Sequence, residues 1–292
     1  MWASARSHPT FLTPHRKRRI SRGLVFALLI LLMVFILFPY YWTIVTTLKP
    51  PQEQFDRVPS FLPRTWTLSN YTWILTQKPF LRSLLNSVIV ASITAVAATV
   101  LNSLSAYSLA RFQYKGKQIV IAFLLGTQMM PGVLTIVPLF VIFSRLGLAN
   151  SHLGLILGFC TFSVPFSMLI LRGFFESLPP DLEEAAIIDG CSRLGAFVRV
   201  VVPLAMPGIS TAALFVFVGA WNDLLFSMII SMDVSTKTAA VALSEMITNQ
   251  FAATNWGGMI AEGAIMTFPV AIVFVFLQRY LIEGLTAGAI KG

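Results

Sequence analysis

The stretch PPDLEEAAIIDGCSRLGAFVRVVVP, residues 179–203, decides the fold, because it is an extended charged stretch between two long apolar runs. Pro180 fixes φ at a value suited to a helix start, and Asp181 places a carboxylate in the first turn, where the helix dipole favours negative charge. Asp189-Gly190 is typical of the turn that ends a helix. The sequence therefore predicts a short helix over residues 181–190.

Hydrophobic residues make up 56% of the 292 residues, and charged residues make up only 11%. This composition excludes a soluble domain of such length and is typical of a membrane protein. A bilayer-spanning helix needs about 20 apolar residues, and six segments are long enough. They lie at residues 24–47, 84–110, 118–143, 153–174, 204–230 and 261–282. The predicted fold class is an all-α membrane protein with six transmembrane helices.

The distribution of basic residues predicts the orientation. Residues 16–19 and Arg22 form a basic cluster before the first apolar segment, which is too long for a cleaved signal peptide and lacks a small-residue cleavage site. The other basic residues that contribute to the net charge of +9 are scattered between apolar segments. This distribution favours a role in setting the membrane topology over nucleic-acid binding. With the N-terminus inside, 14 of the 21 lysines and arginines lie in cytoplasmic segments. Both termini and the loop at 175–203 are therefore expected in the cytoplasm.

Small residues and prolines characterise the predicted spans. A stripe of small side chains, which lets another helix approach closely in lipid, recurs every four residues along the second span: Ser87, Ala91, Ala95, Thr99 and Ser103. Prolines interrupt the later spans at Pro131, Pro138, Pro165 and Pro269, and Pro207 lies near the start of the fifth, where it costs little. Kinked helices around a polar route and ordinary kinks in a packed bundle both fit this pattern.

Polar residues within the spans are candidates for the lining of a translocation route. Trp221, Asn222 and Asp223 are expected together in the outer half of the fifth helix, and Asn102 and Gln128 lie in the second and third spans. An ionisable group at membrane depth usually faces a bundle interior or an aqueous path. Asp223 is therefore the best single candidate, and an interhelical hydrogen bond is its alternative role. Glu262 is expected at the outer interface, where water reaches it.

Catalytic motifs are absent from the sequence. No Gly-x-x-x-x-Gly-Lys-Ser/Thr motif occurs, and the three histidines have no metal-ligand spacing to one another or to the two cysteines. Cys160 lies in an apolar segment and Cys191 in the charged loop, so a disulfide between them is not expected. We expect a chain that is no enzyme and that binds no cofactor and no metal. The energy for any active transport would enter from another subunit.

The predicted helix at 181–190 offers a place for that entry. Its apolar residues Leu182, Ala185, Ala186 and Ile188 lie beside the carboxylates of Glu183 and Glu184. Such a surface suits a groove on a soluble partner that carries basic residues. The alternative is a loop helix that lies on the inner surface of its own chain.

The longer pattern resembles the coupling-loop signature of ABC importer permeases. That signature is Glu-Ala-Ala, three residues, Gly, nine residues and then aliphatic-x-aliphatic-Pro. Its positions are matched here by Glu184, Ala185, Ala186, Gly190, Val200, Val202 and Pro203. Val202 stands where the family usually has Leu. Residues 278–292 are similar to the C-terminal tail of the maltose-type permeases for carbohydrates. Residues 221–223 and Trp256-Gly257 also match landmarks of that subfamily. The resemblance covers nearly the whole chain from Leu24.

This resemblance implies a set of partners in a bacterial cytoplasmic membrane. A second, related permease, a dimer of cytoplasmic ATPase subunits that hold ATP and Mg, and an extracytoplasmic solute-binding protein would assemble with this chain, and no nucleic acid. The first helix would pack against the partner permease, and the loop at 231–260 would reach toward the binding protein. The residues expected to couple to the ATPase are Glu183, Glu184, Ala185, Ala186, Asp189, Gly190 and Pro203. Gly288 and Lys291 in the C-terminal tail are expected to approach it as well.

The predicted organisation is that of a type I ABC importer permease. It has a basic N-terminal tail (1–23), a first helix (24–47), an extracytoplasmic loop (48–83), a five-helix core (84–282) with the coupling loop (175–203), and a C-terminal tail (283–292). The expected function is to form half of the pathway of an ATP-driven carbohydrate importer. Import of glycerol phosphate or a polyol by the same assembly is one alternative. An ion-coupled secondary transporter, which would need intramembrane ionisable groups for its coupling ion, is another.

Overall fold

The computed structural model describes residues 14–248 and 255–289, and within these ranges the chain contains helices and no strand. The helices that form candidate membrane spans, singly or as parts of bent pairs, are α1 (Pro14–Thr47), α4 (Lys78–Arg111), α5 (Lys117–Gln128), α6 (Gly132–Arg145), α7 (His152–Ser177), α11 (Met206–Asn222) and α15 (Trp256–Ala289). The shorter elements are α2 (Pro51–Gln54), α3 (Ser69–Thr76), α8 (Asp181–Ile188), α9 (Arg193–Ala196), the π-helix η1 (Phe197–Val201), α10 (Val202–Leu204), α12 (Leu225–Ile230) and α13 (Ala239–Thr248).

The prediction of an all-helical membrane fold is confirmed, but two of the six predicted spans are broken. Helices α1, α4, α7 and α15 are each long and apolar enough to cross a membrane. The third predicted span is the pair α5 and α6, bent by 105° where Pro131 precedes the first residue of α6. The fifth begins with a 79° bend between Leu204 and Met206. Proline supplies no N–H and cannot continue a helix from the preceding turn, so Pro131 and Pro207 both stand at helix starts.

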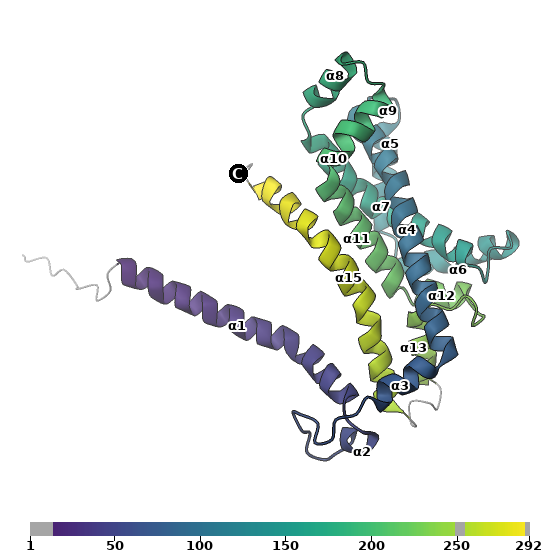
Figure 1. Cartoon of the computed structure of the whole chain (residues 1–292). Coiled ribbons are helices and arrows are strands. Elements are labelled where there is room, and N and C mark those ends of the chain that lie inside the picture. The colour runs from purple at the N-terminus through teal and green to yellow at the C-terminus, as the bar shows by residue number, and fades with distance from the viewer. Residues whose placement is uncertain (1–13, 249–254, 290–292) are drawn as a thin grey trace, which may run out of the picture.

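The core is a bundle in which α4 packs against α7 and α11, and α11 packs against α15 (Figure 1). The predicted small-residue stripe of α4 is buried, with exposed fractions between 1% at Ala91 and 9% at Ala95. Gly158 of α7 also allows a close contact, with Phe226 of α12. A Cβ at Gly158 would lie 2.2 Å from the ring of Phe226. Small side chains thus bring these helices together, as is usual for helix association in lipid.

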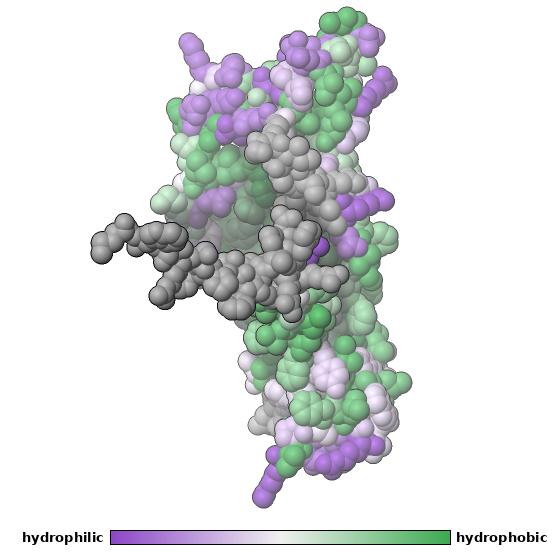
Figure 2. Space-filling view, turned by 90° about the vertical axis from the view of Figure 1, so that its left-hand side faces the viewer, coloured by the Kyte–Doolittle hydropathy of each residue, from purple (hydrophilic) through white to green (hydrophobic). Residues whose placement is uncertain are grey.

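Helix α1 diverges from the bundle and contacts it only near its C-terminal end, beside α15 (Figure 1). Its apolar side chains from Leu24 to Phe38 are all exposed in the single chain. Figure 2 shows hydrophilic side chains at the upper and lower ends of the face it presents, with mostly hydrophobic ones over the lower half between them. This arrangement is the one that a bilayer requires.

The loop after α1 folds onto the start of α15. Glu53 accepts hydrogen bonds from the backbone N–H of Arg64 at 2.9 Å and from the hydroxyl of Ser60 at 2.9 Å. The Arg64 N–H is the main cause that lowers the pKa of this carboxyl below its ordinary value. Gly257 allows the amide groups of Gln54 and Asn70 to approach closely, since a Cβ there would clash with both.

The placement of Glu262 corrects the prediction that water reaches it. Its side chain is 1% exposed, and neither carboxylate oxygen has a hydrogen-bond partner among the described residues. The reason is that α15 begins at Trp256, earlier than the predicted span, and its first turns are covered by α3 and α13.

Candidate functional site

Helix α8 forms where the sequence predicts it, with Pro180 before its first residue. The last helical residue is Ile188, so the predicted segment 181–190 comprises this helix and its terminating turn. Gly190 adopts a φ of +91°, and the N–H groups of Gly190 and Cys191 donate to the carbonyls of Ile187 and Ala186 at 3.0 Å each. A positive φ favours glycine, which carries no Cβ.

Helix α8 carries apolar side chains that the described chain does not cover. Ile188 is 85% exposed, and Leu182 and Ile187, at other positions around the helix, are exposed as well. Exposed Leu194 and Val198 follow on the elements after α8. Glu184 and Asp189 are exposed as well. Exposed apolar side chains gathered at one end of a molecule, next to carboxylates, suit a protein partner.

Glu183 does not belong to this surface, which corrects the expectation that it stands beside Glu184 on the docking face. Its carboxylate accepts from Nε of Arg111 at 3.2 Å and from the hydroxyl of Tyr107, both on α4. The two charged side chains are only 14% and 12% exposed. Nη2 of Arg111 also donates to the carbonyl oxygen of Leu178 at 3.0 Å. These bonds fasten the start of α8 to the end of α4, and we call this group of four residues the latch.

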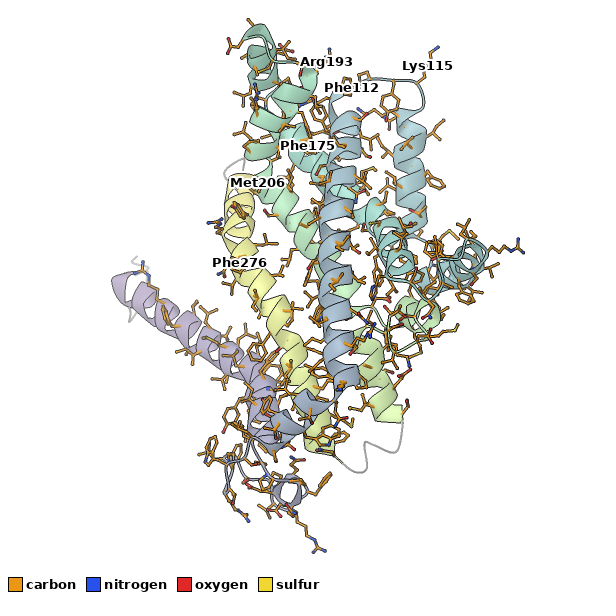
Figure 3. All side chains as sticks on the ribbon, turned by 45° about the vertical axis from the view of Figure 1, so that its right-hand side comes forward. Phe112, Lys115, Phe175, Arg193, Met206 and Phe276 are labelled. Carbon is orange, nitrogen blue, oxygen red and sulfur yellow. The ribbon has the colours of Figure 1, made fainter. Side chains whose placement is uncertain are left out.

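Aromatic packing supports the latch from within the bundle. Tyr107 lies 4.5 Å from Phe197 and 6.0 Å from Phe175, measured between ring centroids. The guanidinium of Arg193 lies 5.5 Å from the ring centroid of Phe112, at the same end of the molecule (Figure 3). A cation over an aromatic face is attracted by the ring quadrupole. The segment after α8 is thereby held against the end of α4.

The remaining residues predicted to couple to an ATPase lie outside α8, on later elements of the chain. Pro203 is exposed within α10, which follows the π-helix η1. Gly288 lies in the last turn of α15, and Lys291 is outside the described residues. Their roles in coupling stay predictions.

The residues predicted to line a route do not meet at one place. Trp221 is 3% exposed and stacks on Phe217 in the core, with ring centroids 5.8 Å apart. Asn102 is 2% exposed and donates from Nδ2 to the hydroxyl of Ser167, which joins α4 to α7. Gln128 is exposed at the end of α5, before the break.

Asp223 lies outside the helix that was predicted to contain it. Helix α11 ends at Asn222, and Asp223 is extended with a ψ of 129°. Its carboxylate accepts from the N–H of Ser227 at 2.8 Å and so caps the first turn of α12. This hydrogen bond gives the carboxylate a partner within the chain. The neighbouring Asn222 is exposed, at the point where α11 ends.

Two asparagines that the sequence analysis passed over organise the end of the bundle opposite α8. Asn150, at a positive φ of 55°, accepts from the N–H of Asp233 at 3.0 Å and from the hydroxyl of Thr236 at 2.7 Å. Asn86 of α4 bonds to the same segment. The available signal was the turn sequence Gly-Leu-Ala-Asn-Ser before α7, since asparagine tolerates the left-handed region.

Comparison with known proteins decides the family. The sequence pattern of the binding-protein-dependent transport system inner membrane component matches residues 103–286, which include α8, the latch and most of the bundle beyond the first part of α4. The chain belongs to this family. Members are transport components, so this permease is a transport subunit and not an enzyme.

Relatives of this permease include the trehalose transport system permease protein SugB of Mycobacterium tuberculosis, 38% identical over 90% of this chain and 95% of that protein. The trehalose/maltose transport system permease protein MalG of Thermococcus litoralis is 32% identical over 95% of this chain and 99% of that protein. The diacetylchitobiose uptake system permease protein DasC of Streptomyces coelicolor is 32% identical over 90% and 95%.

A solved bacterial ABC transporter involved in alginate import has a chain of the same fold. It superposes with a TM-score of 0.79 at 24% identity and covers 94% of this permease and all of that chain. The predicted fold class, an all-helical membrane protein with the fold of an ABC importer permease, is thus confirmed.

Proposed function

We propose that this permease forms half of the translocation pathway of an ATP-driven importer for a carbohydrate. Support comes from its relatives, whose names assign them to trehalose, maltose and diacetylchitobiose. A structural neighbour belongs to an alginate transporter in complex with a periplasmic protein that holds an alginate pentasaccharide. The proposed assembly contains this chain, a second permease, two ATPase subunits and an extracytoplasmic solute-binding protein, in a bacterial cytoplasmic membrane.

The uncovered apolar surface of α8 is the observation that carries the coupling role. Ile188, at 85% exposure, and the exposed Leu182 and Ile187 lie on a helix that the latch holds at the end of the bundle. An ATPase subunit would bind this surface, and Glu184 would meet basic groups at its edge. Because the latch fixes α8 to α4, a displacement of the ATPase would reach the membrane helices.

A variant of Ile188 tests the docking role. We expect Ile188→Asp to abolish co-purification of the ATPase and ATP-dependent uptake, because it places a charge in the centre of an apolar contact. Tyr114→Asp is the matched control, since Tyr114 is an exposed residue (43%) in the turn after α4, at the same end of the molecule. Retention of the ATPase by Ile188→Asp would contradict the docking role of α8.

Energy source and solute require separate measurements. Uptake into proteoliposomes should depend on ATP and on the binding protein, with no requirement for a proton or sodium gradient. Uptake driven by an ion gradient alone would favour the secondary-transporter alternative. The solute that co-purifies with the binding protein identifies the cargo, and a glycerol phosphate or a polyol there would overturn the carbohydrate assignment while leaving the importer intact.

A further inference from the structure

Helix α4 is bonded to a loop element at each of its two ends. At the end near α8, Tyr107 and Arg111 of the latch hold Glu183 and the carbonyl oxygen of Leu178. The bonds at the other end involve the segment between α12 and α13 together with α13, residues 231–248, which we call the distal segment.

At the distal end, two neighbouring side chains of α4 satisfy backbone groups of this segment. Nδ2 of Asn86 donates to the carbonyl oxygens of Ser235 at 3.0 Å and Lys237 at 2.9 Å. The hydroxyl of Ser87 accepts from the N–H of Ala239, the first residue of α13, at 2.8 Å. Asn86 and Ser87 are 4% and 3% exposed. Water therefore does not compete for these bonds, and the distal segment is held to α4 by its own main chain.

The two attachments are far enough apart along α4 to lie near opposite faces of a bilayer. Ser87 and Arg111 are 24 residues apart in one continuous helix, which corresponds to about 36 Å at 1.5 Å per residue. The hydrocarbon core of a bilayer is about 30 Å thick. Figure 1 shows the same arrangement, with α8 and α13 at opposite ends of α4.

Helix α4 is also the one uninterrupted span in the described part of the chain that has no proline in its interior. Three of the four uninterrupted spans, α1, α7 and α15, contain a proline inside the helix, at Pro39, Pro165 and Pro269. The pairs α5–α6 and α10–α11 are bent at a break. In α4 the single proline is Pro79, in the first turn, where it removes no helical hydrogen bond. Proline is a frequent site of sharp helix kinks, which absorb displacement, and the interior of α4 contains none.

We propose that α4 is a rigid strut that connects α8 to the distal segment, with Asn86 and Ser87 as the positioning residues at its distal end. This inference rests on the proposed function, because the strut would link the solute-binding protein outside to the ATPase inside. Contact of the binding protein with the distal segment shifts α4, and the latch moves α8 with it. By thermodynamic linkage, the state of the ATPase biases the distal segment to the same extent.

The test uses the complete complex, reconstituted in liposomes with its ATPase, second permease and binding protein. Ser87→Ala removes the acceptor of the Ala239 N–H with little change in volume, and Asn86→Asp removes both side-chain donors. Ser105→Ala is the matched control on the same helix, because the Ser105 hydroxyl donates to the carbonyl oxygen of Leu101 within α4 and to no other described residue. The readout is the factor by which solute-loaded binding protein stimulates ATP hydrolysis, normalised to the amount of assembled complex.

We expect Ser87→Ala and Asn86→Asp to lower this factor by about threefold or more, within the range by which single residues modulate coupling between sites, and Ser105→Ala to retain it. Combining Ser87→Ala with Glu183→Gln should be no worse than the worse single variant, because both break one connection in series. Wild-type stimulation in both distal variants, or effects that multiply in the double variant, would overturn the strut. Absence of ATP-dependent uptake in the wild-type complex would overturn the proposed function instead, and the strut with it.

Discussion

At the scale of single residues, Glu183 and Glu184 are neighbours in sequence with opposite surroundings. The carboxylate of Glu183 is held by Arg111 and Tyr107, and the side chain of Glu184 is exposed. The two substitutions to glutamine therefore test two different interactions, one within the chain and one with a partner.

We expect Glu183→Gln to lower the thermal stability of the isolated permease, because it leaves the largely buried guanidinium of Arg111 without its carboxylate. Hydrogen bonds to charged groups contribute about 1.5–3 kcal/mol each, so we expect a loss of that order. Glu184→Gln should leave that stability unchanged and weaken only the binding of the ATPase. Thermal unfolding in detergent and co-purification measure the two effects, and equal unfolding temperatures for the two variants would contradict the latch.

Asp223 gives a second prediction at this scale. Its carboxylate caps α12 through the N–H of Ser227, so Asp223→Ala should lower stability by about 1 kcal/mol, the usual effect of removing a helix cap. Uptake per assembled complex should stay near the wild-type value. Asp223→Asn, which keeps an acceptor oxygen, should recover most of the stability. A normal yield of complex with strongly reduced uptake per complex would instead return Asp223 to a translocation route.

At the scale of elements, close helix contacts in this protein depend on glycines, which carry no side chain. The contact between α7 and Phe226 is one of the closest of these approaches, since a Cβ on Gly158 would lie 2.2 Å from the phenyl ring. Phe226 is itself fully buried and packs edge-on against Phe159, with centroids 5.5 Å apart. The ring has no room to retreat.

We expect Gly158→Ala to destabilise the bundle by about 1–3 kcal/mol, the usual effect of overpacking. Gly173→Ala is its matched control in the same helix, because a Cβ at Gly173 meets nothing within 4 Å. The control should be neutral or slightly stabilising, since alanine favours helix more than glycine does. The yield and unfolding temperature of the purified permease measure the difference, and equal values would show that Phe226 adjusts without loss.

At the scale of the whole molecule, the apolar surface of α1 is exposed in the single chain. A helix that diverges from its own bundle must be covered by lipid or by another chain. The resemblance to importer permeases predicts that the second permease covers it. We expect extraction in mild detergent to yield one copy of this chain, one related permease and two ATPase subunits, as determined by native mass spectrometry. A stable, transport-competent homo-oligomer that lacks an ATPase would contradict both the assembly and the proposed function.

Much of this protein follows from local sequence patterns. Helix α8 was predictable because Pro180, the acidic first turn and Gly190 act on neighbouring backbone groups, and the observed φ of +91° at Gly190 agrees with that expectation. The small-residue stripe of α4 was equally clear, because a four-residue repeat always lies on one face of a helix.

The partners of individual side chains were decided only by the tertiary structure. Glu183 and Arg111 are 72 residues apart in the chain, and Asn86 and Ser235 are 149 apart. No local pattern reports such pairs, so Glu183 was assigned to the wrong surface and Asn86 was overlooked. Asp223 and Glu262 show the same limit. Hydropathy places a residue at a depth along a helix, but the helices that pack around it determine whether its charge meets water, a backbone N–H or no partner.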